Sequence, residues 1–137
     1  MRLRDVMSEV VETVGPDASV ERAREQMRRQ DVRHLVVLEG GAIRGVVSQH
    51  DLQRAGRSAA VRAVMSAPVV TATPQTDLRQ AANLLRGNHV SCLPLLDEQE
   101  RLVGMVTVSD LLDLIGKGVT RKPETEARPR RSWVPGR

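Results

Sequence analysis

The sequence predicts an α+β fold made of two tandem β-α-β-β-α repeats that pack sheet to sheet about a pseudo-twofold axis. Three observations lead to this prediction. The triplet VMS at residues 6–8 recurs at residues 64–66, and collinear matches follow it along the chain. The pattern GVVSQHDL at residues 45–52 recurs as GMVTVSDL at residues 104–111. Finally, one unit of about 55 residues is too small to bury a good core alone, whereas two stacked units share one.

The first part of each repeat predicts a short extended segment and then an amphipathic helix. The extended segments, at residues 10–14 and 69–73, end at Pro16 and Pro74. Apolar residues then recur at helical spacing, so that one face of each helix is buried. These positions are Val20, Ala23 and Met27 in the first copy and Leu78, Ala81, Ala82 and Leu85 in the second. The candidate N-caps are Asp17 or Ser19 and Thr76 or Asp77.

The second part of each repeat predicts two strands and a second helix. Continuous apolar runs at 35–38 and 93–96 are typical of buried strands, and turns at 39–41 and 97–100 lead to strands at 43–47 and 102–106. The second helices begin near Ser48 and Thr107. We therefore assign the first repeat to residues 1–60 and the second to residues 61–117. The remainder, 118–137, is polar, proline-rich and basic, and we expect it to be disordered.

Composition narrows the classes of function. With 40% hydrophobic and 28% charged residues, the chain is typical of a globular protein, and no apolar run is long enough to span a membrane. Cys92 is the single cysteine, which favours a reducing, cytoplasmic location. Trp133 is the single aromatic residue, so there is no stacking platform for nucleic acid. The positive charge is concentrated from Lys117 onward, which leaves the tail as the one candidate for nucleic-acid binding.

The repeated pattern Ser48-x-x-Asp51 and Thr107-x-x-Asp110 has two interpretations. A hydroxyl and free backbone amides at the start of a helix favour a phosphate, and a carboxylate one turn later can accept hydrogen bonds from both hydroxyls of a ribose. The same pattern is also that of a capping box, which needs no ligand. A duplication would repeat either feature, so the pattern alone leaves both open.

The whole ordered set resembles the CBS-domain pair, also called the Bateman module. The resemblance rests on the two VMS triplets, the apolar-Pro-apolar-apolar run at 93–96 and the paired Gly-apolar-apolar-Ser/Thr-x-x-Asp-Leu endings, and it covers residues 1–116. It implies a regulatory unit that binds an adenosine-containing ligand (AMP, ADP, ATP or S-adenosylmethionine) in clefts between the repeats. It also implies that two modules associate through their helices, which predicts a homodimer.

The resemblance further implies roles for individual residues. Asp51 and Asp110 would bind the ribose, and Ser48, Thr107, Thr13 and Thr71 would line the cleft beside the ribose or phosphate. Arg33 and His34 would supply positive charge to a phosphate, and their counterparts Ser91 and Cys92 would not, so we expect unequal sites. The adenine would meet the backbone near Val11 and Val69 and pack between Val46, Val47, Met105 and Val106.

The sequence shows no catalytic machinery, and we predict that the protein is not an enzyme. His34, His50 and His89 lack partners at metal-ligand spacing, and no nucleotide-binding glycine loop or nucleophile elbow is present. The leading hypothesis is therefore a regulatory module that senses an adenosine-containing ligand and signals to an unidentified target protein. The alternative is a homodimeric assembly module with vestigial sites, whose tail binds an acidic partner.

Overall fold

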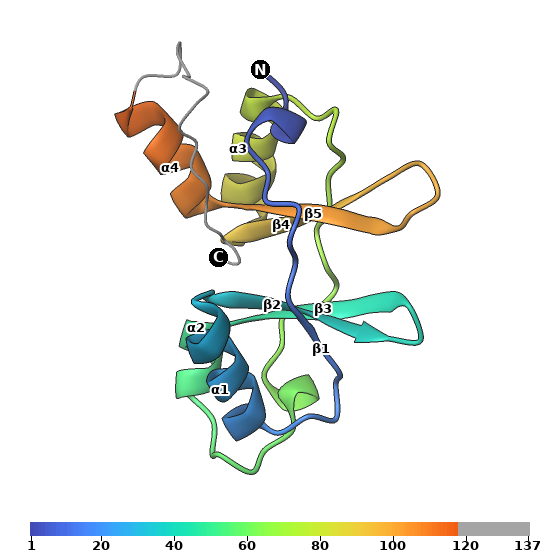
Figure 1. Cartoon of the computed structure of the whole chain (residues 1–137), viewed down its shortest axis with the longest axis vertical. Helices are drawn as coiled ribbons and strands as arrows, with labels where there is room; N and C mark the ends of the chain where they lie inside the picture. The colour runs from blue at the N-terminus through green and yellow to red at the C-terminus, as the bar shows by residue number, and fades with distance from the viewer. Residues whose placement is uncertain (118–137) are drawn as a thin grey trace.

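The computed structural model describes residues 1–117 and confirms the predicted fold of two tandem repeats. Each half is a small sheet with helices on its outer face, and the two sheets face each other across the middle of the molecule (Figure 1). The tail at 118–137, expected to be disordered, lies outside the described residues. Within residues 1–117, no helix has both the length and the apolar character that crossing a membrane requires.

The first half has one more paired strand than the second. Its elements are β1 (Thr13–Val14), α1 (Val20–Gln30), β2 (His34–Glu39), β3 (Ala42–Ser48) and α2 (Gln49–Gln53). Strand β2 is central, parallel to β1 and antiparallel to β3. The elements of the second half are α3 (Leu78–Asn88), β4 (Cys92–Leu96), β5 (Leu102–Thr107) and α4 (Val108–Gly116). There the segment equivalent to β1 forms only a single parallel bridge between Ala72 and Leu95.

Both long helices, α1 and α3, begin at one of the two candidate caps that the sequence offered for each. Of the candidate caps, Ser19 accepts a hydrogen bond from the Arg22 amide at 3.1 Å, and Asp77 accepts one from the Gln80 amide at 2.8 Å. Each helix then ends at a residue in the left-handed conformation, Asp31 at φ 56° and His89 at φ 57°.

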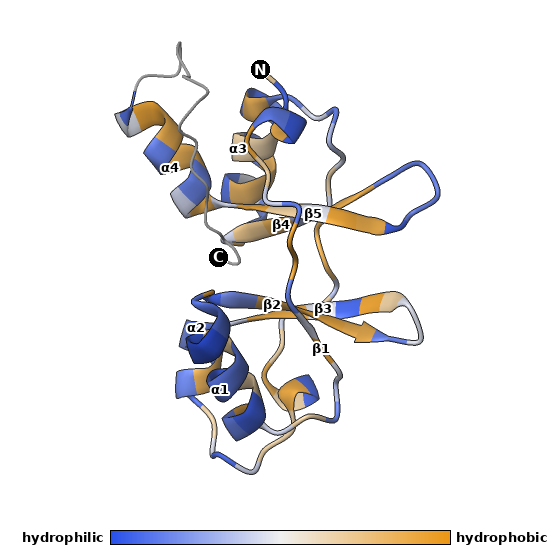
Figure 2. Cartoon of the chain, in the orientation of Figure 1, coloured by the Kyte–Doolittle hydropathy of each residue, from blue (hydrophilic) through white to orange (hydrophobic). Residues whose placement is uncertain are grey.

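Strand alternation divides the apolar residues into three cores. Leu35, Val37 and Val47 face the helices of the first half, and an equivalent cluster around Leu93, Leu95 and Val106 fills the second. The opposite faces of the strands form a third cluster, whose buried members are Val36, Cys92 and Met105. This third cluster joins the two sheets, and the strands along it are largely apolar (Figure 2).

Each repeat contributes a short helix to the core of the other half. A short 3₁₀ helix, η1 (Leu3–Asp5), buries Leu3 in the core of the second half. Its counterpart η2 (Val61–Ala63) buries Val61 in the core of the first. The connecting chains run in opposite directions between the halves (Figure 1). Each half is therefore completed by a segment from the start of the other repeat's sequence.

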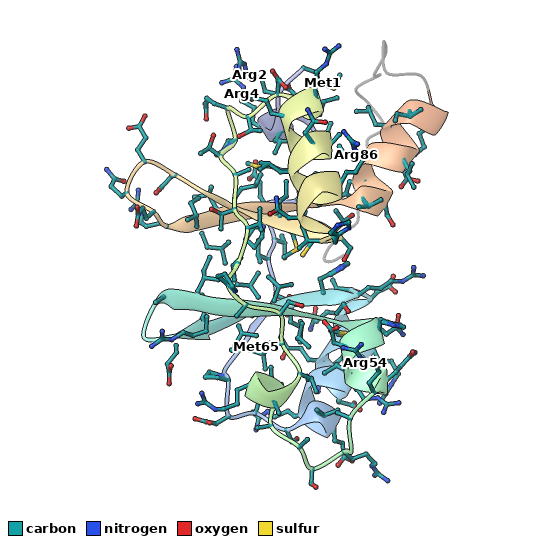
Figure 3. The ribbon with its side chains drawn as sticks, turned by 180° about the vertical axis from the view of Figure 1, so that it is seen from behind. Met1, Arg2, Arg4, Arg54, Met65 and Arg86 are labelled. Atoms are coloured by element: carbon teal, nitrogen blue, oxygen red, sulfur yellow. The ribbon has the colours of Figure 1, made fainter. Side chains whose placement is uncertain are left out.

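The glycines of the repeated motif, Gly45 and Gly104, lie in close contact with these crossing segments. A Cβ at Gly104 would lie 2.8 Å from Met7 Sδ and 2.9 Å from the Ser8 carbonyl oxygen. At Gly45 the same distances, to Met65 Sδ and the Ser66 oxygen, would be 2.7 and 2.8 Å. Met65 lies on the helix-facing side of the first sheet (Figure 3). The VMS triplet and the glycine are thus two parts of one contact, which occurs twice.

Candidate functional site

Two cavities open between the repeats. We call the first the Asp110 cleft: it has a volume of about 390 Å³ and is lined by the chain at 8–12, by the end of α1 with the start of β2, and by the start of α4. The second, the Asp51 cleft, has a volume of about 160 Å³ and is lined by residues 66–70, by the end of α3 with the start of β4, and by the start of α2. Each cleft takes its walls from both repeats, as the resemblance implied.

The two clefts are equivalent under the internal repeat. Ser8 and Val11 of the Asp110 cleft correspond to Ser66 and Val69 of the Asp51 cleft. On the opposite wall, Met105, Thr107 and Asp110 correspond to Val46, Ser48 and Asp51. The structure thus brings together most of the residues that the sequence singled out, in two groups.

The hydroxyl and carboxylate of each motif form a capping box. Ser48 Oγ accepts from the Asp51 amide at 3.1 Å, while the Ser48 amide donates to Asp51 Oδ2 at 2.8 Å. The corresponding distances for Thr107 and Asp110 are 3.1 and 2.9 Å. The structural interpretation of the motif is therefore confirmed. A capping box does not by itself exclude a ligand, because an ionised carboxylate offers about four acceptor positions.

His34 lies between the two clefts and lines both. Its Nε2 lies 2.8 Å from Ser91 Oγ, which joins the first repeat to the second. Burial lowers the pKa of His34 to about 4, outweighing the opposing effect of Asp51. The expectation that His34 supplies positive charge is therefore wrong for the free protein at neutral pH. Arg33 is exposed and lines the Asp110 cleft.

Four of the predicted contacts lie outside both clefts. Val47 and Val106 are fully buried against the helices, because strand alternation points them away from Val46 and Met105. The prediction that they pack on an adenine is corrected for this reason. Thr13 and Thr71 are half-buried and line neither cleft. In β1, the carbonyl oxygen of Thr13 instead accepts from Gln26 Nε2 at 2.9 Å.

Sequence reasoning missed several lining residues, above all the carboxylates of the Asp110 cleft. These are Glu12, Asp31 and Asp113. Two signals in the sequence were available: Asp31 and Glu12 stand close to predicted site residues, and Asp113 follows Asp110 by one helical turn. Within residues 1–117 no three histidine, cysteine or acidic side chains cluster closely enough to hold a metal ion.

Cys92 is a structural residue of the sheet interface. It is buried, and this burial raises the pKa of its thiol to about 12. The thiolate that nucleophilic chemistry needs is therefore scarce at neutral pH.

The chain belongs to the CBS domain family. The sequence model of that family, the CBS domain, matches the chain twice, over residues 3–58 and 61–117. A CBS domain-containing protein of Bacillus subtilis, YhcV, is 30% identical over 115 residues, which are 80% of this chain and 81% of that protein. The homoserine O-acetyltransferase of Methanococcoides burtonii is 34% identical over 82% of this chain. The match covers only 24% of that enzyme, and the chain spans about a quarter of the first curated relatives.

Solved CBS-domain structures share the fold. A CBS domain pair in complex with 5′-methylthioadenosine and S-adenosyl-L-methionine matches with a TM-score of 0.79 at 22% identity, covering 85% of this chain and 97% of that one. The cytosolic domain of the Mg²⁺ channel MgtE, in complex with ATP, matches with a TM-score of 0.68 at 31% identity, covering 80% and 46%.

Proposed function

We propose that the chain is a non-catalytic regulatory module that binds an adenosine-containing ligand between its CBS repeats and signals its occupancy to a target protein. The observation that carries this proposal is the pair of equivalent clefts, each built from both repeats and each bordered by a helix start with a hydroxyl and a carboxylate. Support comes from the relatives solved with S-adenosyl-L-methionine, 5′-methylthioadenosine or ATP.

In this proposal Asp110 and Asp51 accept hydrogen bonds from the ribose hydroxyls. The backbone at Val11 or Val69 meets the adenine edge, and Met105 or Val46 packs on its face. Thr107 or Ser48 lies beside the group attached to the ribose, and Arg33 meets an anion in the Asp110 cleft. Because the ligand would touch both repeats, its binding would favour one relative arrangement of the two halves, which is the requirement for a signal.

Thermal unfolding with and without millimolar adenosine compounds tests the proposal. A ligand at 100 times its dissociation constant adds about 2.7 kcal/mol to the free energy of unfolding. For 117 described residues, a shift of this size raises the Tm by about 10 °C. Guanosine is the control compound, since it presents a different base edge with the same ribose.

Two matched variants separate the clefts. Asp110→Asn and Asp51→Asn each keep an oxygen that can accept the capping hydrogen bond, but each loses the charge that holds a diol. We expect each variant to reduce the shift that arises from its own cleft. If no adenosine compound raises the Tm, the sensor function is wrong.

A second candidate is a homodimeric assembly module, and one observation favours it. Helix α4 exposes three large apolar residues, Val108, Leu112 and Ile115, which are 37, 61 and 64% accessible. They border an apolar groove of about 320 Å³ between α3 and α4. The equivalent face of the first half, around α1 and α2, is lined by Arg24, Arg28, Asp31 and other polar residues.

Light scattering after gel filtration tests this second candidate. Leu112→Ser with Ile115→Ser would convert a dimer to a monomer if the groove is the interface. The control, Arg24→Ser, changes the polar face of the first half. A wild-type chain that is monomeric at high micromolar concentration would contradict the assembly function.

A further inference from the structure

The two clefts have equivalent backbones but different charges. Among residues 1–117, the larger cleft carries, beside Asp110, the carboxylates of Glu12, Asp31 and Asp113 and the guanidinium of Arg33. In the smaller cleft Val70 stands where Glu12 would be, and His89 where Asp31 would be. Its one carboxylate, Asp51, lies 3.5 Å from the guanidinium of Arg54. The two copies of the site therefore share a shape and differ in charge.

The carboxylates of the Asp110 cleft come from different elements of the fold. Glu12 Oε1 accepts from Gln26 Nε2 at 3.1 Å, and this neutral amide orients the carboxylate without cancelling its charge. Asp31 is the left-handed residue that ends α1, and Asp113 lies on α4 one turn beyond Asp110. Arg28, near the end of α1, pairs with Glu25 instead. The carboxylates are too dispersed to hold a metal, so they act as a negative field around the cavity.

This field disfavours a polyphosphate. A nucleoside triphosphate would bring several negative charges to a cleft in which the described residues add the carboxylates of Glu12, Asp31 and Asp113 and the single guanidinium of Arg33. At about 7 Å in a largely aqueous cleft, each pair of unit charges changes affinity by about threefold. A tail with an ammonium, a carboxylate and a sulfonium fits better, because its carboxylate can meet Arg33 while its cations meet the acidic residues.

We propose that the Asp110 cleft selects adenosine ligands with a zwitterionic or cationic tail, of the S-adenosylmethionine type, over adenosine polyphosphates. This inference rests on the proposed function and specifies the ligand class at one of its two sites. It also revises the expectation drawn from Arg33 and His34, which had favoured a phosphate. Arg33 becomes the partner of a single carboxylate.

Isothermal titration calorimetry on the full chain tests the selection, with S-adenosylmethionine, S-adenosylhomocysteine, AMP and magnesium-free ATP at low salt. We expect S-adenosylmethionine to bind at least about tenfold more tightly than ATP. S-adenosylhomocysteine and AMP should bind with intermediate affinities. The preference should diminish in high salt, because Asp31 and Asp113 are exposed to solvent and their charges are screened.

Charge-removing variants assign the preference to this cleft. Asp113 is exposed on α4, so Asp113→Asn should not disturb the fold. Asp31→Asn is chosen because asparagine, like aspartate, tolerates the left-handed conformation at this position. Each variant should reduce the affinity for S-adenosylmethionine by about threefold and increase the affinity for ATP by a similar factor. Glu98→Gln, an exposed residue in the β4–β5 turn, is the matched control and should change neither affinity.

The outcomes separate the two proposals. If ATP binds as tightly as S-adenosylmethionine, or if Asp113→Asn and Asp31→Asn leave the ratio of affinities unchanged, the charge selection is wrong while the sensor function stands. If none of the four compounds binds, both fail.

Discussion

Substitution of Gly104 by alanine tests the contact that joins the two repeats. The added methyl group would lie 2.8 Å from Met7 Sδ and 2.9 Å from the Ser8 carbonyl oxygen. The methionine side chain can turn away. The carbonyl cannot, because Ser8 and Met105 exchange two backbone hydrogen bonds, each of 2.9 Å.

The cost of this substitution follows from that geometry. Overpacking by one carbon costs typically about 1–3 kcal/mol, and lengthening a buried backbone hydrogen bond adds about 1 kcal/mol. We therefore expect Gly104→Ala to lower the free energy of unfolding by about 2–4 kcal/mol, which lowers the Tm by about 8–16 °C. Gly45→Ala, opposite Met65 and the Ser66 oxygen, should cost a similar amount.

Urea unfolding followed by circular dichroism at 222 nm measures the effect, since helices such as α1 and α3 give a signal that unfolding removes. Gly87→Ala is the control. It lies in α3, where no atom comes within 4 Å of the position that the added methyl group would take, so alanine should stabilise by up to about 1 kcal/mol. An unchanged urea midpoint for Gly104→Ala would refute the role of the repeated glycine in seating the VMS segment.

Three further predictions concern the Thr107 cap, the half-buried His34 and the buried Cys92. Thr107→Ala removes the hydroxyl that accepts from the Asp110 amide, and it should lower the free energy of unfolding by about 1 kcal/mol in urea titrations; Thr107→Ser should restore it. Because the pKa of His34 is lowered to about 4 from 6.5, the unfolded chain takes up a proton between these pH values that the folded chain does not. The free energy of unfolding should therefore fall as the pH drops from 6.5 to 4, and His34→Gln, but not His50→Gln, should flatten that dependence; an equal slope in both would contradict it. Cys92, with its thiol pKa raised to about 12, should react with a thiol reagent at pH 8 only after urea unfolds the chain, and rapid labelling of the folded chain would refute its burial.

The periodicity of the sequence predicted most of the fold, because local patterns determine local structure. The apolar spacing within α1 and α3 and the continuous runs in β2 and β4 correspond directly to elements. The crossing of η1 and η2 into the opposite halves was not predicted, since it depends on contacts between residues far apart in sequence. The contacts of Gly104 with Met7 and of Gly45 with Met65 position the crossing segments, but a contact between residues so far apart cannot be deduced from local patterns.

The sequence predicted which residues lie near the two clefts better than it predicted the charges that line them. The repeat correctly identified Asp51, Asp110 and their hydroxyl partners as residues at the cleft walls. It could not show that Val47 and Val106 point away, because the register of β3 and β5 against the sheets decides which residues alternate inward. Glu12, Asp31 and Asp113 also line the Asp110 cleft, and they were missed although each stands near a predicted site residue in the sequence.

A crystal structure of the full chain grown with S-adenosylmethionine tests the proposed binding mode most directly. We predict electron density for the nucleoside between Val11 and Met105, with both ribose hydroxyls within hydrogen-bonding distance of Asp110. Clear density for the protein with water alone in both clefts, at a ligand concentration well above the dissociation constants typical of such sites, would contradict it.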